Sequence, residues 1–97
     1  MKLEDWRNEI DSIDAEIICL LNQRAKLARK IGTLKATAGL PITDSEREEK
    51  ILRGVCNLNR GNLTDETIVR IFREILRSSK QIQNETIKKI IENGAAI

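Results

Sequence analysis

Five polar residues of this chain stand at positions where its helical pattern otherwise places apolar side chains. They are Arg24, Lys35, Glu48, Ser79 and Gln83. Arg24 and Lys35 are eleven residues apart, which is close to three turns of an α-helix, so they project from nearly the same face. Two fixed cations on one face suit a small anion that carries carboxylates or phosphates. We therefore expect the five residues to converge on a buried polar pocket.

Each of these residues also has an ordinary structural interpretation. A lone polar residue in a helical seam can fix register or oligomeric state. A serine can bond back to its own helix, and a lysine can extend along its methylenes to solvent. Five such positions in 97 residues nevertheless favour a shared pocket. Arg47 adds a nearby cation, and Glu48 is expected to accept a hydroxyl or to balance a cation.

A very long helix must carry Arg24 and Lys35. Apolar residues recur from Leu3 to Leu34 at alternating spacings of three and four, which predicts one amphipathic helix over residues 3–37. Its end is predicted at Gly39, which can adopt the left-handed cap conformation. Arg7, on the flank of the same helix, would lie about 25 Å from Arg24 along the axis. It is therefore either a surface arginine or a residue that reaches the pocket of a partner chain.

Two further helices are predicted, over residues 44–59 and 64–92. Either Thr43 or Asp44 suits the N-cap of the second helix. The third carries an apolar stripe that Ser79 and Gln83 interrupt one turn apart. After Glu92 the tail is expected to fray.

The length of the first helix predicts a second chain. Residues 3–37 would span about 50 Å, whereas a compact domain of this size is about 30–35 Å across. The protruding seam is apolar, and its exposure to water is unfavourable. We therefore expect an all-α fold with a three-helix protomer, one domain over residues 1–97, assembled as an intertwined homodimer with twofold symmetry.

The composition excludes several classes of protein and site. The net charge is +2 with both signs interspersed, which is unlike the concentrated basic face of a nucleic-acid binder. Cys19 and Cys56 are far apart and the chain has no histidine, so no metal site and no Ser or Cys triad of the usual kind is expected. The two cysteines are expected to be free thiols. No signal peptide or membrane span is recognised, and the cytoplasm is the expected location.

Taken together, these residues resemble the all-helical chorismate mutases over about residues 4 to 90. The similarity is carried by segments of all three predicted helices, namely Trp6-Arg7, residues 10–14, 20–24 and 27–28, Ile31-Gly32 and Lys35, residues 39–48, and residues 71–75 with Ser79 and Gln83. The resemblance implies an interlocked dimer of three-helix protomers. It also implies the rearrangement of chorismate to prephenate without a cofactor or a metal.

The resemblance further implies a role for each of eight site residues. Arg24 and the partner's Arg7 would hold the two substrate carboxylates, with Arg47 and Ser79 in support. Lys35 and Gln83 would address the ether oxygen of the breaking bond. Glu48 and the backbone at Asp44 would hold the ring hydroxyl.

Two alternatives stay open on the sequence alone. One is an isochorismate pyruvate lyase of the same fold, whose relatives differ around the second helix, so Asp44, Arg47 and Glu48 favour the mutase. The other is a non-catalytic helical dimerisation or regulatory module, in which Arg24 and Lys35 would be solvated or paired within the protein. Members of the family also occur fused to other enzymes of the same pathway, so the chain is either a whole enzyme or one domain of a larger one.

Overall fold

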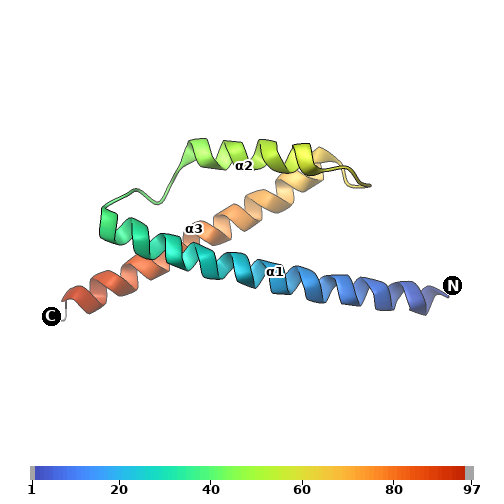
Figure 1. The fold of residues 1–97 in the computed structure, drawn as a ribbon, viewed down its shortest axis with the longest axis horizontal. Coiled ribbons are helices and arrows are strands. Elements are labelled where there is room, and N and C mark those ends of the chain that lie inside the picture. Colours follow the sequence, from blue (N-terminus) through green and yellow to red (C-terminus); the bar gives the residue numbers. More distant parts are fainter. Residues whose placement is uncertain (1, 96–97) are drawn as a thin grey trace.

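The computed structural model describes residues 2–95 and consists of three helices, α1 (Leu3–Ala38), α2 (Ser45–Leu58) and α3 (Asp65–Ala95) (Figure 1). This confirms the all-α fold and the very long first helix. The expected ranges 3–37, 44–59 and 64–92 differ from these bounds by at most one residue at five of the six ends. The expectation of a frayed tail after Glu92 is wrong for residues 93–95, which continue α3, and residues 96–97 of that tail lie outside the described residues. One glycine at position 94 costs a helix only about 1 kcal/mol, which is too little to end it.

The connection from α1 to α2 follows from two local signals. Gly39 adopts φ of 68°, in the left-handed region that glycine enters without a steric cost. Leu40 then donates its backbone N–H to the carbonyl of Lys35 at 2.9 Å, which closes the end of α1. Asp44, and not Thr43, caps α2, because its carboxylate accepts from the backbone N–H of Arg47 at 3.0 Å.

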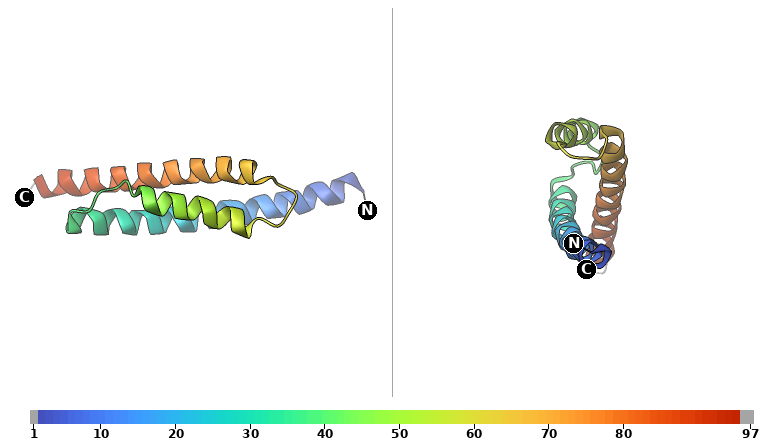
Figure 2. Two further views of the ribbon diagram at one scale, coloured as in Figure 1. Left: turned by 90° about the horizontal axis from the view of Figure 1, so that it is seen from above. Right: turned by 90° about the vertical axis from the view of Figure 1, so that its right-hand side faces the viewer.

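The helices α1 and α3 cross, and α2 spans the open side of the crossing (Figures 1 and 2). Ala28 and Gly32 of α1 are buried where the two long helices meet. A Cβ on Gly32 would lie 3.1 Å from the Cα of Gln83, so the absence of a side chain permits this close approach. Within the described residues α2 packs against α3 but not against α1, so a space is left between α1 and α2.

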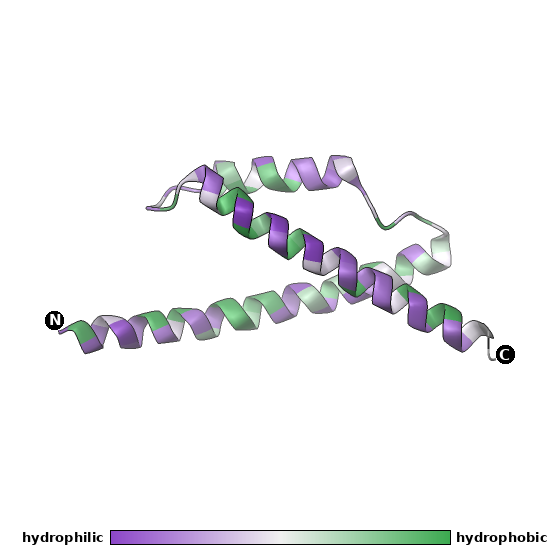
Figure 3. Ribbon diagram, turned by 180° about the vertical axis from the view of Figure 1, so that it is seen from behind, coloured by the Kyte–Doolittle hydropathy of each residue, from purple (hydrophilic) through white to green (hydrophobic). Residues whose placement is uncertain are grey.

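The described residues form only a very small core. The apolar side chains buried among them are Ala28 and Leu76. The radius of gyration is 17.4 Å, compared with about 13 Å for a compact domain of this length. The apolar seam in the first half of α1 is exposed, with Trp6 at 53% and Ile10 at 56% of full exposure, and the hydropathy colouring shows apolar residues along this helix (Figure 3). Among residues 2–95, the first half of α1 therefore keeps a long apolar face exposed.

Two further features concern the described part of the chain. None of its helices combines the length and the apolar character that crossing a bilayer requires. Cys19 and Cys56 are free thiols, as expected; Cys19 is exposed and Cys56 is half-buried.

Candidate active site

A pocket of about 440 Å³ lies between the three helices. Its volume falls in the range of small-molecule sites. Seven of the eight expected site residues line it, namely Arg24, Lys35, Asp44, Arg47, Glu48, Ser79 and Gln83. Apolar side chains form the rest of the wall, among them Leu27, Ile31, Ile51 and Leu76. The structure therefore brings polar groups from all three helices together in one largely apolar cavity.

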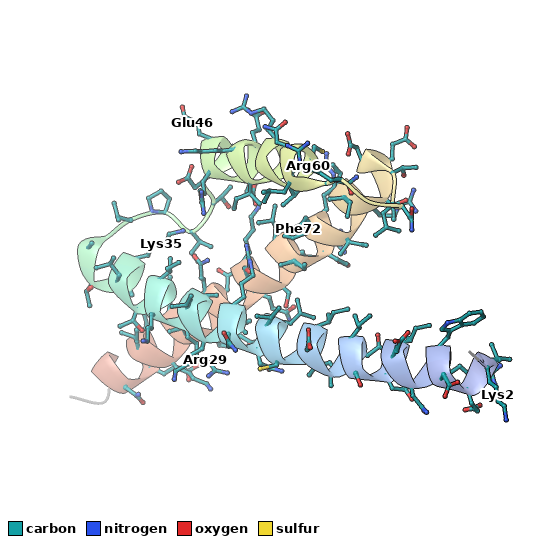
Figure 4. The ribbon with its side chains drawn as sticks, turned by 45° about the vertical axis from the view of Figure 1, so that its right-hand side comes forward. Lys2, Arg29, Lys35, Glu46, Arg60 and Phe72 are labelled. Atoms are coloured by element: carbon teal, nitrogen blue, oxygen red, sulfur yellow. The ribbon has the colours of Figure 1, made fainter. Side chains whose placement is uncertain are left out.

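Lys35 and Gln83 meet at one end of this pocket. The Lys35 ammonium donates to Oε1 of Gln83 at 3.0 Å and to the carbonyl of Ile42 at 2.8 Å. The side chain of Lys35 thus extends from α1 to the segment that connects α1 and α2 (Figure 4). Gln83 is only 8% exposed. Because Lys35 occupies the amide oxygen of Gln83, the amide nitrogen is left to donate to a ligand.

Arg24 and Ser79 form the second polar group of the pocket. The Arg24 guanidinium donates to the hydroxyl of Ser79, and that hydroxyl donates to the carbonyl of Ile75, one turn back on α3, at 3.0 Å. Ser79 therefore both bonds to its own helix and orients Arg24. Burial, and to a smaller extent the nearby Arg47 cation, lower the pKa of Arg24. Both causes disfavour the charged form of Arg24, and a bound anion would counteract them.

Lys80 is a pocket residue that sequence reasoning missed. Its ammonium lies 2.7 Å from the carboxylate of Glu48 and joins α3 to α2. Glu48 thus balances a cation, one of the two roles expected for it. The available signal was spacing: Lys80 precedes Gln83 by three residues and so shares a helix face with it.

The pocket carries an excess of positive charge. Four cations line it, Arg24, Lys35, Arg47 and Lys80, against two carboxylates, Asp44 and Glu48, which leaves a formal charge of +2. Among the ion pairs of the described residues, none involves Arg24 or Lys35, whose polar partners are neutral groups. A dianion is the ligand that this balance favours.

Arg7 lies outside this pocket. Its side chain is 62% exposed and pairs with Glu4 at 3.3 Å, near the free end of α1. The structure of one protomer thus does not bring Arg7 to the other seven residues.

Comparisons with known proteins agree with this geometry. The model of the family "Chorismate mutase type II" matches residues 6–84. A chorismate mutase of Methanocaldococcus jannaschii is 33% identical over 89 residues, which are 91% of this chain and 90% of that protein. A bifunctional chorismate mutase/prephenate dehydratase of Aquifex aeolicus is 42% identical over 88 residues, 87% of this chain. The chain spans about a quarter of that bifunctional protein, since the match covers 24% of its length.

One solved structure with the same fold is a complex with prephenate. The crystal structure of chorismate mutase from Helicobacter pylori in complex with prephenate superposes with a TM-score of 0.81. The two sequences are 31% identical, and the match covers 89% of this chain and 93% of that one.

Proposed function

This chain belongs to the chorismate mutase type II family, and on that premise we propose that it rearranges chorismate to prephenate in the pocket between its helices. The observation that carries the proposal is the convergence of Arg24 and Lys35, neither with a carboxylate partner among the described residues, with the amide of Gln83 in one cavity. The substrate is a dicarboxylate, and the pocket's excess charge of +2 complements it. The solved relative in complex with prephenate supports the same class of ligand.

The reaction makes few demands on side-chain chemistry. In a Claisen rearrangement the ether C–O bond breaks and a C–C bond forms within one molecule, with no proton or electron supplied from outside. An enzyme can help by holding the flexible enolpyruvyl arm in a chair-like reactive conformer. It can also stabilise the negative charge that develops on the ether oxygen. A pocket that lacks histidine and offers cations and amide donors meets both needs.

Lys35 and Gln83 are the proposed donors to the ether oxygen. Their bond of 3.0 Å brings the two donor groups to one point of the pocket wall. It also fixes the amide so that its nitrogen, and not its oxygen, is available to the ligand. Preorganised donors of this kind typically contribute about 3 kcal/mol to lowering a barrier. Gln83 needs no proton from solvent to act, since its amide is always a donor.

Arg24 is the proposed anchor for a substrate carboxylate, with Ser79 and Arg47 in support. Its bond to Ser79 holds the guanidinium in place, and its planar donors suit a bidentate contact. Burial and the Arg47 cation lower the pKa of Arg24, and a bound carboxylate would oppose both effects. Glu48 and the backbone at Asp44 are the proposed acceptor and donor for the ring hydroxyl. Both lie at the start of α2, where the cap on Arg47 fixes the first turn.

We propose that the working enzyme is a homodimer in which Arg7 of each chain completes the pocket of the other. The protomer exposes 8032 Å², whereas a compact monomer of this mass exposes roughly 5,600 Å². The excess, roughly 2,400 Å² per chain, is the size of an obligate dimer interface. The exposed apolar residues of α1, the helix that carries Arg7, offer a surface for such an interface.

The test is a direct assay with the purified chain. Chorismate and isochorismate are supplied in parallel, and the products are identified. We expect loss of chorismate with prephenate as the product, and a rate lower by about a hundredfold or more with a Lys35→Ala variant. Release of pyruvate from isochorismate would indicate the lyase, and a folded protein inert to both would refute the proposal. The Aquifex aeolicus relative joins a mutase to a prephenate dehydratase, which supports a role in aromatic amino acid synthesis, with the cytoplasm as the expected location.

A further inference from the structure

Among the ion pairs of the described residues, the one between Lys80 and Glu48 is the one that joins two helices. The Nζ of Lys80 lies 2.7 Å from Oε1 of Glu48, and the side chains are 37% and 28% exposed. Both residues line the pocket. The other two ion pairs, of Arg7 and of Arg77, join neighbours on a single exposed helix face. The resemblance to the family assigns a role to Glu48 but none to Lys80.

The position of Glu48 creates an electrostatic problem for the proposed function. The pocket must hold two ligand carboxylates, and Glu48 places a third carboxylate within the same cavity of about 440 Å³. Like charges a few ångströms apart in a partly desolvated site repel each other appreciably. A hydroxyl acceptor is still needed there, because a ring hydroxyl without a partner would lose its hydrogen bond with water.

We propose that Lys80 is a positioning residue that acts through Glu48: it neutralises this carboxylate and holds it against α3, so that the pocket can accept a hydroxyl and still bind a dicarboxylate. The inference rests on the proposed function and extends it to a residue that determines ligand affinity. Lys80 acts on binding rather than on the bond-breaking step, because its ammonium is engaged by Glu48 while Lys35 and Gln83 form the separate donor pair. A partly exposed pair of this kind contributes little to folding stability.

The first test separates KM from kcat. Lys80→Met is expected to raise KM for chorismate by about three- to tenfold, since an uncompensated charge at a partly screened distance costs about that much in binding. The value of kcat should change by less than about twofold, because the donors to the ether oxygen are untouched. Lys80→Arg should restore KM. Lys88→Met removes the same charge from an exposed position of α3 and is the matched control, expected to leave KM and kcat unchanged.

The second test asks whether Lys80 acts through Glu48. In a Glu48→Gln background, Lys80→Met should raise KM no further, because the charge that it balances is gone. An equal rise in both backgrounds would overturn the proposal and indicate a direct contact with the ligand. An unchanged KM in Lys80→Met would overturn it as well.

Two measurements distinguish a failure of the Lys80 proposal from a failure of the proposed function and from damage to the fold. The affinity of each variant for prephenate, measured by calorimetry, should follow the same pattern as KM. Thermal unfolding of Lys80→Met should match that of Lys88→Met, and a much lower midpoint would indicate a structural role instead. A wild-type chain that neither binds prephenate nor consumes chorismate would refute the proposed function, whereas an active wild type with unaltered Lys80 variants would refute this inference alone.

Discussion

Replacing Gly32 by alanine sets two opposing effects against each other. Alanine is favoured over glycine inside a helix by about 0.5–1 kcal/mol. The added Cβ, however, would lie 3.1 Å from Cα and 3.3 Å from the carbonyl oxygen of Gln83, and 3.3 Å from Cβ of Thr86. Two of these atoms belong to the backbone of α3 and cannot rotate away, and overpacking of this kind costs about 1–3 kcal/mol. We therefore expect a net loss of stability of about 1 kcal/mol, or a midpoint lower by about 4–8 °C.

The same substitution should also reduce activity. To restore an ordinary contact of 3.4 Å, the two helices must separate by roughly 0.3 Å at the crossing. Lys35 stands three residues beyond Gly32 on α1, and its partner Gln83 is the residue pushed away, so the separation stretches their bond of 3.0 Å. Because donor placement matters on this scale, kcat is expected to fall by about three- to tenfold.

Gly54 provides the matched control. It lies in the interior of α2, and a Cβ there meets no heavy atom within 4 Å in the protomer. Gly54→Ala should therefore stabilise the protein by about 0.5–1 kcal/mol and leave kcat unchanged. Chemical unfolding at one fixed protein concentration, with chorismate turnover, measures both effects. A Gly32→Ala protein as stable as Gly54→Ala, with full kcat, would refute the argument that this glycine sets the distance between α1 and α3.

Three further predictions follow from the site. Lys35→Ala should lower kcat by about a hundredfold or more, since a preorganised donor contributes about 3 kcal/mol; a stopped assay against prephenate standards measures it, and a loss of less than about tenfold would contradict the assigned role. Mixing and refolding an Arg7→Ala chain with a Lys35→Ala chain should recover about a quarter of the wild-type activity, because half of the dimers are mixed and each has one intact site; two parents that stay inactive together would exclude a shared site. Activity should persist from neutral to mildly basic pH, because Gln83 donates without titrating; a pH–rate profile that collapses above pH 6 would contradict this role of Gln83.

The sequence predicted the features of the fold that depend on neighbouring residues. The heptad-like seam predicted α1, and Gly39 predicted its end, because helix periodicity and capping are properties of neighbouring residues. It left the cap of α2 open between Thr43 and Asp44, which carry equivalent capping chemistry, and the geometry selects Asp44. The grouping of the pocket residues was predicted because several polar groups interrupted apolar faces at once.

Lys80 shows where such reasoning fails. A lysine beside the apolar stripe of a helix has the same appearance in the sequence whether it is solvated or turned toward a carboxylate on another helix. Its bond to Glu48 spans 32 positions of the chain and depends on how α2 packs on α3. No local pattern carries that information. The role of Arg7 stays a prediction for a related reason, because the second chain that it would contact has the same sequence and adds no further pattern to read.

Arg24 is the residue at which α1 passes from an exposed segment to one that packs within the chain. Every described residue before it is exposed in the protomer, and Arg24 is the first along the helix that is not. Before this point no other part of residues 2–95 covers the apolar seam; after it, Ala28 and Gly32 pack against α3 and Lys35 faces the pocket. Because α1 is one continuous helix, the apolar seam of the proposed interface and the pocket residues Arg24 and Lys35 lie on the same element.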